Sequence, residues 1–457
     1  TGSGPGRHEH AADGQPTRIV HANATSPRIE YDANGRVRQQ ADIVSATQAV
    51  ISATRYTLAG GLRVKAEVFD SGSTASGTGS LTLANPANSR AYEYDGAGRL
   101  VKETLTVRGS SDTRVTTYAY DRAGNRTSRS VVAPGVNVTT SYSYDTNDRL
   151  IQESRSSGGS IAYAWDANGN LIKKTEAGQV TLYAWDAENR LIEVKRGATE
   201  AGAVVVASYL YDADGNRVQK TEPLSGKVTQ YLVDGSFPFA QVLEEKESLG
   251  AATETTQYVW GTGLLKQIRG GQGSYYHADA LGSVKALTNE AGSQTDSYEY
   301  EAFGELASHA GTTANPYRYT GEHYDDATGL QYNRARWYEA NAGRWLGVDP
   351  FPGNPSRPST LNKYAYASND PVGNVDPSGL FSLGGMMSGL NSMGTLMNIA
   401  LPIYDFVYER LAPSEDSPLD ANGNRRETLW DSLMAMLVPT IMDGLPMAGV
   451  AMVSSVS

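Results

Sequence analysis

The stretch YAWDANGNLIKKTEAGQVTLYAWDAENRL, residues 163–191, contains two copies of one short unit. In each copy two aromatic residues stand two positions apart, so on a β-strand both side chains would lie on the same face. The segment that follows, DANGN or DAENR, is a turn signal, because Asp can cap a turn through its carboxylate and Gly or Asn accepts a positive φ. Each unit therefore predicts a β-hairpin that buries an aromatic face against its neighbours.

The same unit recurs along the first half of the chain. Its aspartates, from Asp95 to Asp212, follow one another at intervals of 20 to 26 residues, which indicates a repeat architecture rather than a single globular core. One hairpin cannot bury its own face, but stacked hairpins form a continuous sheet. We therefore predict a mainly β protein built from a strip of hairpins. The units with this pattern begin or end at Tyr31, Leu100, Arg126, Leu150, Leu171, Leu191 and Val218.

Composition supports this fold class and excludes several functions. Hydrophobic residues make up only 39% of the chain, and 48 glycines and 27 tyrosines point to many turns and aromatic strands. The net charge of -11, with no cluster of Lys and Arg, argues against a nucleic-acid-binding face. The absence of cysteine excludes disulfides and thiolate metal sites. The half calcium loop at Asp212 has Pro223 where the twelfth-position Glu should stand, so we expect no metal, and we find no motif for a nucleotide or other cofactor.

The chemistry of the chain changes after Leu380. All nine methionines lie between Met386 and Met452, whereas 25 of the 27 tyrosines lie at or before Tyr366. Residues 1–28 are rich in Gly, Pro, His and Ala without periodicity, which is typical of a linker or an N-terminal end. The sequence therefore predicts a repeat region and a chemically different tail that are joined at Leu380.

Two long segments before this junction carry a series of motifs. They are YYHADALGSVKALTNEAGSQTDSYEYEAFGEL at residues 275–306 and YRYTGEHYDDATGLQYNRARWYEANAGRWLGVDP at residues 317–350, and DPSGL follows at residues 376–380. The patterns H-x-D-x-L-G-S, Y-D-x-x-T-G-L-x-Y-x-R-x-R-x-Y, G-R-x-x-x-x-D-P and D-P-x-G-L stand here in the order found in the RHS/YD-repeat polymorphic toxin family. The chain resembles that family over residues 29–380.

The resemblance implies a container. Family members wind a strip of YD-repeat β-hairpins into a hollow, cocoon-like shell, and the chain after the closing motif is a variable toxin held inside. Carried onto this sequence, residues 29–273 form the repeat shell and residues 274–380 the core-associated domain. Residues 381–457 would then be a small, mainly α, hydrophobic toxin or plug.

The resemblance also implies that the core-associated domain cuts its own chain between Leu380 and Phe381 by an aspartyl-protease-like reaction. The implied catalytic residues are Asp349, Asp376 and Arg344. Two carboxylates held close together cannot both ionise easily, so one keeps a proton while the other activates water. Arg344 would orient a carboxylate or stabilise the developing oxyanion. Asp-Pro pairs also commonly cap turns, and the residues alone leave that interpretation open.

Further residues of this domain bear on the predicted cleavage. Gly379 lets the backbone approach closely beside the cut, and Pro377 restricts the strand that presents it. Asp370 adds a third acid to the same segment. His277 and His323 could suggest a hydrolase, but no Gly-x-Ser-x-Gly motif accompanies them. We expect both histidines to be packed or hydrogen-bonded strand residues.

The tail begins with an uncharged segment of 24 residues, 381–404, which is long enough to span a bilayer core as a helix. Gly385 and Gly389 form a G-x-x-x-G pattern that allows close helix contact in lipid, and Met393 and Met397 continue the apolar segment. A polar loop and a second apolar segment follow, which together suggest a helical hairpin. The tail is predicted to be a membrane-active, pore-forming or depolarising toxin; the alternative is a hydrophobic plug.

The resemblance implies the encapsulating shell of a secreted RHS toxin, similar to type VI secretion effectors or toxin-complex components, that acts in interbacterial competition and is delivered into target cells. The expected partners are its own tail as cargo, a secretion spike or chaperone or a partner YD-repeat chain, an immunity protein and the target-cell membrane, but no nucleic acid. Two alternatives stay open. One is a toxin-complex component that closes with a separate YD-repeat chain, and the other is a surface-exported protein that binds carbohydrate or a neighbouring cell.

Overall fold

The structure of the chain is a computed structural model. The chain forms two compact units, residues 1–390 and 391–457. The residues that the structure describes all belong to the first unit. They are residues 7–10, 16–76, 81–237, 239–261, 263–355, 358–380 and 382–384.

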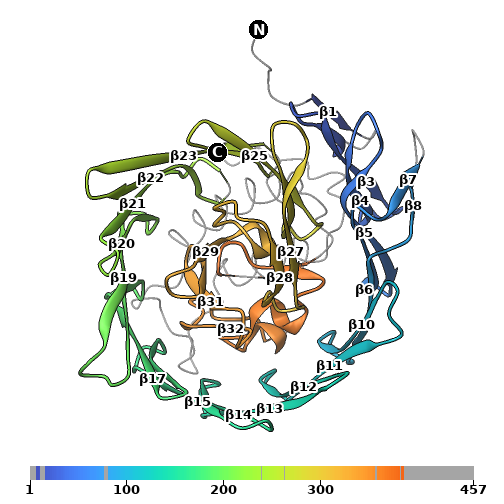
Figure 1. The fold of residues 1–457 in the computed structure, drawn as a ribbon. Coiled ribbons are helices and arrows are strands. Elements are labelled where there is room, and N and C mark those ends of the chain that lie inside the picture. The colour runs from blue at the N-terminus through green and yellow to red at the C-terminus, as the bar shows by residue number, and fades with distance from the viewer. Residues whose placement is uncertain are drawn as a thin grey trace, which may run out of the picture. The chain divides into compact units, whose positions relative to one another are not determined.

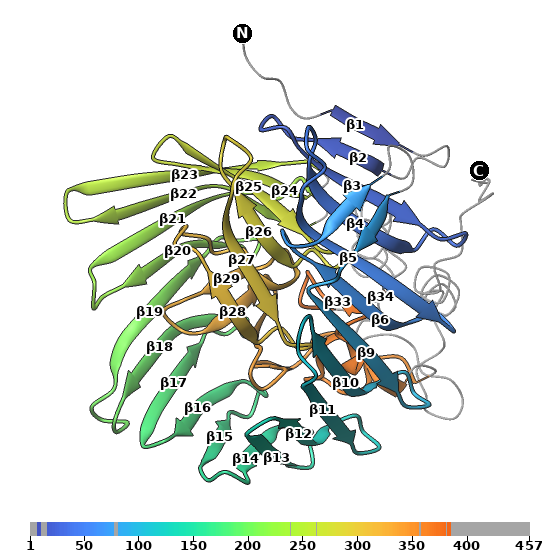
Figure 2. The same cartoon turned by 45° about the vertical axis from the view of Figure 1, so that its right-hand side comes forward.

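A 26-stranded antiparallel sheet forms a long curved strip (Figures 1 and 2). Each strand pairs with the next one along the chain, except that β6 pairs with β9. The strands are β1 (Arg7–His10), β2 (Pro16–Val20), β3 (Thr25–Tyr31), β4 (Val37–Val44), β5 (Val50–Ala59), β6 (Leu62–Phe69), β9 (Asn88–Tyr94), β10 (Leu100–Val107), β11 (Thr113–Tyr120), β12 (Arg126–Ala133), β13 (Val136–Tyr144), β14 (Leu150–Arg155), β15 (Ser160–Trp165), β16 (Leu171–Glu176), β17 (Gln179–Trp185), β18 (Leu191–Gly197), β19 (Val204–Tyr211), β20 (Arg217–Glu222), β21 (Lys227–Asp234), β22 (Gln241–Leu249), β23 (Ala252–Trp260), β24 (Leu264–Arg269), β25 (Gln272–Ala278), β26 (Val284–Thr288), β27 (Gln294–Tyr300) and β28 (Leu306–Ala310).

The predicted hairpin strip is confirmed, and it begins earlier and runs further than expected. Strands β1 and β2 lie within residues 1–28, which were expected to be a linker; Ile19 is buried and β2 pairs with both β1 and β3. The single apolar pair in PTRIV is too short to give a periodic signal, so pairing with β1 and β3 decides its structure. The sheet also continues without a break across residue 273 through β25 to β28.

The turns of the strip follow the predicted chemistry. In the unit at residues 142–150, Asp145 Oδ1 accepts hydrogen bonds from the backbone N–H of Asn147 at 2.9 Å and of Arg149 at 3.0 Å. The guanidinium of Arg149 donates to Asp145 Oδ2 at 2.6 Å and to the backbone oxygen of Asp166, in the next unit, at 2.9 Å. The aspartate therefore caps its own turn, as predicted, and the arginine links that turn to the next one.

The two aromatic residues of each unit lie on one face of the strip, as predicted. The first one is buried, for example Tyr163 and Tyr183, and the second packs against the same core. The second aromatic also donates a hydrogen bond to a backbone oxygen of the preceding unit. The pairs are Tyr120 to Leu100, Tyr144 to Arg126, Trp165 to Leu150, Trp185 to Leu171, Tyr211 to Leu191 and Trp260 to Val242, with distances of 2.7 to 2.8 Å.

An inner module, residues 317–380, lies within the curve of the strip (Figure 1). Its four-stranded sheet packs Leu330, Tyr332 and Trp337 against the buried tyrosines and leucines of β13 to β19. Its elements are η1 (Tyr319–Gly321), β29 (His323–Asp325), β30 (Leu330–Asn333), β31 (Arg336–Glu339), β32 (Arg344–Trp345), η2 (Pro358–Thr360), η3 (Tyr366–Asn369) and β33 (Asn374–Val375), and β34 (Leu383–Gly384) pairs with β33. A separate hairpin of β7 (Thr74–Ser76) and β8 (Thr82–Ala84) interrupts the strip.

Strands from the first half of the strip also contact strands near its end. His277 on β25 is fully buried, and its ring nitrogens lie 3.1 Å from Asp42 Oδ1 and 2.8 Å from Thr288 Oγ1. Arg114 and Arg129 form ion pairs of 3.2 and 3.3 Å with glutamates at the turn between β27 and β28. The expectation that His277 is a hydrogen-bonded strand residue is confirmed.

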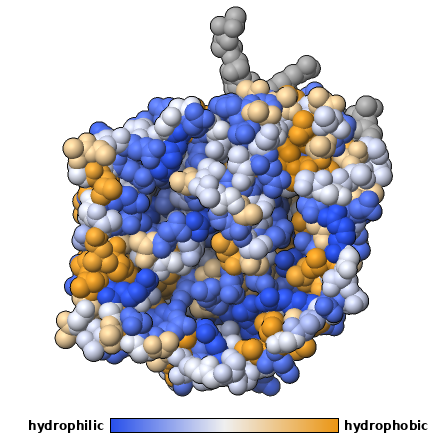
Figure 3. Space-filling view, viewed as in Figure 1, coloured by the Kyte–Doolittle hydropathy of each residue, from blue (hydrophilic) through white to orange (hydrophobic). Residues whose placement is uncertain are grey.

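The opposite face of the strip carries exposed apolar side chains among polar ones. Leu210 and Leu232, which alternate with buried tyrosines, are 57% and 59% exposed. Figure 3 shows hydrophilic and hydrophobic residues interspersed on the face seen in Figure 1. The helices in the described ranges are short 3-10 turns, and none has the length and apolarity to cross a membrane. The predicted membrane-active residues Gly385, Gly389, Met393 and Met397 lie outside the described residues.

Candidate autoproteolytic site

The closing motif of the chain forms the loop of a small hairpin. Strand β33 leads into residues 376–380, and the chain returns as β34, which pairs with β33 in antiparallel fashion. Leu380, on the N-terminal side of the predicted cut, is partly buried within this loop. Phe381, on the other side, lies outside the described residues. The predicted cleavage site therefore lies between two short paired strands.

The turn between β30 and β31 holds this loop through its backbone oxygens. Four consecutive residues of the turn each donate one hydrogen bond to one of four consecutive carbonyl groups. The pairs are Asn333 Nδ2 to Asp376 O at 2.7 Å, Arg334 Nη1 to Pro377 O at 2.6 Å, Ala335 N to Ser378 O at 3.2 Å, and Arg336 Nε to Gly379 O. We call this set the carbonyl clamp.

Close approach in the carbonyl clamp requires glycine at position 379. Gly379 has φ of +73°, in the left-handed region, and a Cβ atom there would lie 2.5 Å from the backbone oxygen of Asn333 and 2.8 Å from the backbone nitrogen of Arg336. These atoms belong to backbone and cannot give way easily. Any side chain at this position would push the loop away from the turn.

The two predicted aspartates meet at a third residue, Arg336. Its Nη2 lies 2.9 Å from Asp349 Oδ2 and 3.2 Å from Asp376 Oδ2, and its guanidinium stacks on Trp345 at 4.3 Å. The other carboxylate oxygens bind backbone: Oδ1 of Asp349 accepts from Phe351 N at 2.9 Å, and Oδ1 of Asp376 accepts from the N–H of the cleavage-site leucine at 3.1 Å. Each aspartate thus caps a turn with one oxygen and faces Arg336 with the other.

Arg344 does not take the position expected of it. Its guanidinium donates to the backbone oxygen of Asp148 at 2.8 Å and to Asn125 Oδ1 at 3.2 Å, and it stacks on Tyr144 at 4.7 Å. Neighbouring residues on a strand point to opposite faces, and Trp345 points toward Arg336. Arg344 therefore points toward the strip, and the arginine between the aspartates is Arg336.

Burial sets the protonation of the acids. It raises the pKa of the Asp349 carboxyl above its usual range, although the positive charge of Arg336 and the N–H of Phe351 oppose this rise. Burial also raises the pKa of Asp370 to about 6. Asp370 Oδ1 accepts from Gly373 N at 2.9 Å and so caps a separate turn. Among the residues that the structure describes, no group of three potential ligands could hold a metal ion.

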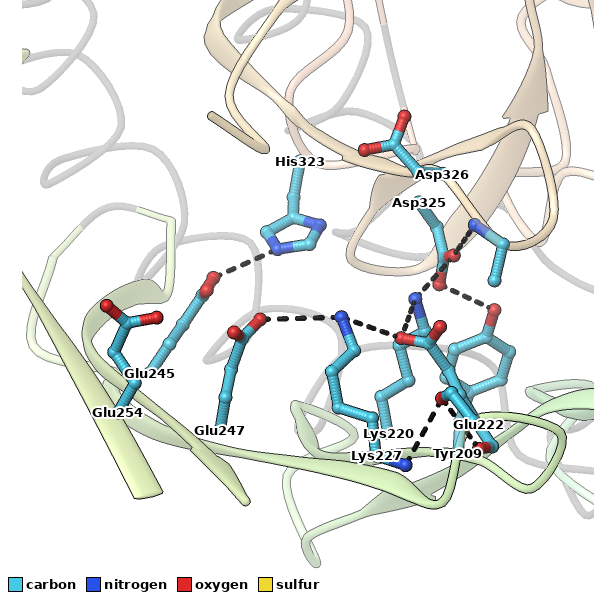
Figure 4. Close-up of polar contacts among 12 residues, drawn as sticks. Tyr209, Lys220, Glu222, Lys227, Glu245, Glu247, Glu254, His323, Asp325 and Asp326 are labelled. Atoms are coloured by element: carbon cyan, nitrogen blue, oxygen red, sulfur yellow. Dashed lines mark hydrogen bonds and ion pairs between the residues drawn. The ribbon is translucent and has the colours of Figure 1, made fainter. Parts of the chain in front are cut away.

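A second polar cluster fixes the inner module to the strip (Figure 4). Asp325 on β29 accepts from Lys220 Nζ at 2.7 Å and from the hydroxyl of Tyr209 at 2.8 Å. His323 Nε2 lies 3.0 Å from Glu245 Oε1, in line with the expected hydrogen-bonded strand histidine. Burial lowers the pKa of His323, so its ring is neutral and Nε2 donates to the glutamate. These contacts position β29, and through it the turn that carries the carbonyl clamp.

Sequence reasoning missed the residues of the carbonyl clamp. Their signal is the N-R-A-R segment at residues 333–336, inside the motif that also supplied the family resemblance. Arg344, the arginine nearest the Asp-Pro motif, was predicted to be the catalytic arginine instead. Only the pairing of β30, β31 and β32 shows which of the two arginines faces the aspartates.

Comparison with known proteins finds a matching family model, relatives of similar sequence and solved structures of similar fold. A family model described as the teneurin YD-shell matches residues 28–237 and 80–372. The tRNA3(Ser)-specific nuclease WapA of Bacillus spizizenii is 36% identical over 300 residues, which are 63% of this chain and 12% of that protein. The toxin protein Tse5 of Pseudomonas aeruginosa is 26% identical over 342 residues, which are 63% of this chain and 25% of that protein. The TcdB2-TccC3 crystal structure has a TM-score of 0.65 and 20% identity, with 83% of this chain and 20% of that chain covered.

These similarities concern the strip and the inner module. The chain spans only 12% and 25% of the lengths of the two curated relatives, and the likeness to TcdB2-TccC3 is one of fold. The family model nevertheless reaches from the first strands of the strip into the segment that carries Asp370. The chain therefore belongs to the teneurin YD-shell family.

Proposed function

We propose that residues 29–380 are the encapsulating shell of an RHS-type toxin and that the shell holds the C-terminal tail of the same chain. The observation that supports this is the curved strip, which turns its aromatic face toward the inner module and the closing DPSGL loop. Leu383 and Gly384, the last residues that the structure describes, pair with β33 directly after this loop. Secretion, delivery into target cells, a secretion spike and an immunity protein remain predictions from the family.

We also propose that the shell cuts its own chain between Leu380 and Phe381. The observation that carries this proposal is the contact of one Arg336 nitrogen with both Asp349 and Asp376, while Asp376 also binds the Leu380 N–H. Arg336 reduces the repulsion between the carboxylates, and the raised pKa of Asp349 favours its protonated form.

The reaction is a hydrolysis in which each acid has one role. The Asp376 carboxylate takes a proton from water, and the water oxygen attacks the carbonyl carbon of Leu380. The carboxyl of Asp349 donates its proton to the carbonyl oxygen of Leu380. When the tetrahedral intermediate collapses, Asp376 gives the proton that it took from water to the amide nitrogen of Phe381, Asp349 takes back a proton from a hydroxyl of the intermediate, and the C–N bond breaks. The products are a carboxylate at Leu380 and an amine at Phe381.

Intact mass under denaturing conditions tests this proposal. We expect wild type to give two pieces, the smaller one beginning at Phe381, and the Asp349→Asn and Asp376→Asn variants to remain one chain. Asp370→Asn is the matched control, because Asp370 is a buried acid of the same segment that caps a separate turn, and this variant should still be cut. An uncut wild type, or cleavage in Asp349→Asn, would overturn the assignment.

For the tail we propose a membrane-active role, on the evidence of its uncharged 381–404 segment. Dye release from anionic phospholipid vesicles tests it, with wild type denatured and diluted into the vesicles and a chain that ends at Leu380 as the control. Release by wild type alone is expected. No release from either chain would favour the plug.

A second candidate is a shell completed by a partner YD-repeat chain. The last strand of the strip, β28, supports it: all five of its residues are exposed, and among the described strands it pairs only with β27. Such an edge is able to accept a further strand. A stable stoichiometric complex with a second YD-repeat chain in size-exclusion chromatography would support this candidate, and its loss on substituting Ser308 with Pro would locate the contact.

A further inference from the structure

The chain on the far side of the predicted cut is bound to the shell in its own right. Val375 pairs with Leu383, and Asn374 pairs with Gly384, across the loop that contains the cleavage site. Leu383 is 4% exposed and Val375 is 7% exposed. The segment after the cut therefore contributes one buried apolar side chain and a short stretch of paired backbone.

The two sides of the cut are held by different parts of the molecule. On the N-terminal side, the carbonyl clamp of residues 333–336 binds the backbone oxygens of residues 376–379. On the C-terminal side, β33 binds β34. Neither set of contacts includes the Leu380–Phe381 peptide bond, so hydrolysis of that bond removes none of them.

We propose that β33 and the buried site of Leu383 form a docking site for the new N-terminal end of the tail. This inference rests on the proposed cleavage. The occupant is residues 382–384 of the same chain, recognised by strand pairing through their backbone and by burial of the single large side chain, Leu383. Ser382 and Gly384 on either side are small and leave the backbone free to pair.

The docking site separates cutting from release. Before the cut, β34 is connected to β33 through a short loop, and its return to the strand is intramolecular. After the cut, residues 382–384 dissociate only when the strand pair opens and Leu383 leaves its buried position. Because the contact is short, it is reversible, and the tail is retained without being locked to the shell. Hydrolysis thus produces a docked tail, and a later event releases it.

Hydrogen exchange followed by mass spectrometry tests the docking site on the full chain. The fragment that contains Leu383 and Gly384 is compared in cleaved wild type and in uncut Asp349→Asn, with a denatured sample as the reference for full exchange. We expect the amides of this fragment to be protected to a similar degree in both proteins. In Leu383→Ser, exchange in the cleaved chain should be at least tenfold faster. Leu306→Ser, which alters an exposed leucine, is the matched control and should change nothing.

The outcomes separate the inference from the proposed cleavage. An uncut wild type in the intact-mass measurement would overturn the cleavage and, with it, the docked product. A cut wild type whose 382–384 fragment exchanges as fast as the denatured reference would overturn the docking site alone. Protection in the cut chain that Leu383→Ser removes would support it, provided that the shell fragments of this variant exchange as in wild type.

Discussion

The strip and the inner module are held together by different kinds of contact. In six units of the strip, the second aromatic bonds to a residue 14 to 20 positions earlier, so the same contact recurs along the strip. The inner module depends on single contacts over long distances in sequence. Asp325 and Lys220 are 105 residues apart, and Arg344 and Asn125 are 219 apart.

This difference predicts which of the two regions tolerates substitutions and which does not. A repeated neutral contact can be lost in one unit while the others stay in place, because each unit interacts mainly with its neighbours. A buried ion pair that occurs once has no substitute, and removing one partner leaves the other charged and buried. We therefore expect substitutions in the inner module to have larger effects than equivalent substitutions in the strip.

The largest effect is expected for Asp325→Ala, which removes the nearest carboxylate of the buried Lys220 and leaves it only Glu222, at 3.1 Å. The free energy of unfolding should fall by about 3–5 kcal/mol, measured by urea denaturation. The neighbouring Asp326 is the control: its side chain is 71% exposed, and Asp326→Ala should cost about 0–1 kcal/mol. Equal losses for the two variants would contradict the proposed difference between the regions.

Two glycines with positive φ give the second comparison. Gly379→Ala places a methyl group against the backbone of the carbonyl clamp and should slow cleavage by about 100-fold through misplacement of the loop. Gly98 in the strip has φ of +79° with nothing within 4 Å of its Cβ position. Gly98→Ala should leave cleavage unchanged and cost about 1–2 kcal/mol in stability. The time course of cleavage after refolding measures the first effect, and unchanged cleavage in Gly379→Ala would show that the clamp does not position the loop.

A smaller effect is expected for the repeated contact itself. Trp185→Phe removes the hydrogen bond to the backbone oxygen of Leu171 and should lower stability by about 1–2 kcal/mol. Trp165→Phe, in the preceding unit, should have a similar effect. If the units behave as repeated neighbours, the two losses should add in the double variant. A loss far above the sum would show that the strip folds as one indivisible unit.

The smallest effect is a dependence of stability on pH that belongs to the inner module. The pKa of His323 is lower in the folded state than in the unfolded state, where it is about 6.5. Its contribution to the free energy of unfolding is therefore present above about pH 6.5 and declines as the pH falls through that value. Asp370 acts in the opposite sense: its pKa is raised to about 6, and its contribution is lost as the pH rises toward that value. Relative to His323→Gln, wild type should lose stability between pH 7.5 and 5.5, as read from urea midpoints. A constant difference would show that His323 is not linked to folding.

The strip could be predicted from sequence because its contacts are local. The two aromatics and the aspartate of each unit suffice to place a strand face and a capped turn, and the observed hydrogen bonds of Asp145 match that prediction. Strand β2 was missed because its pairing with β1 and β3, and not its own composition, makes it a strand.

The candidate site was only partly accessible from sequence. The closing motifs identified Asp349 and Asp376, which the structure brings to one arginine. The identity of that arginine depends on which side chains of β31 and β32 point toward the loop of residues 376–380. Strand pairing within the four-stranded sheet determines this. Neither composition nor spacing contains that information, so Arg344 was assigned in place of Arg336.

The bond from each second aromatic to the preceding unit also sets how such a shell can change its size. Trp185 requires only a backbone oxygen at the start of the strand before it, and every unit offers one in the same place. If a whole unit is deleted or duplicated, the aromatic at the new junction finds an equivalent acceptor, whereas insertion of one residue shifts the strand by half its side-chain period. The perimeter of the strip can therefore vary in evolution by whole units, so that gene duplication changes the length of the strip while the inner module stays unchanged.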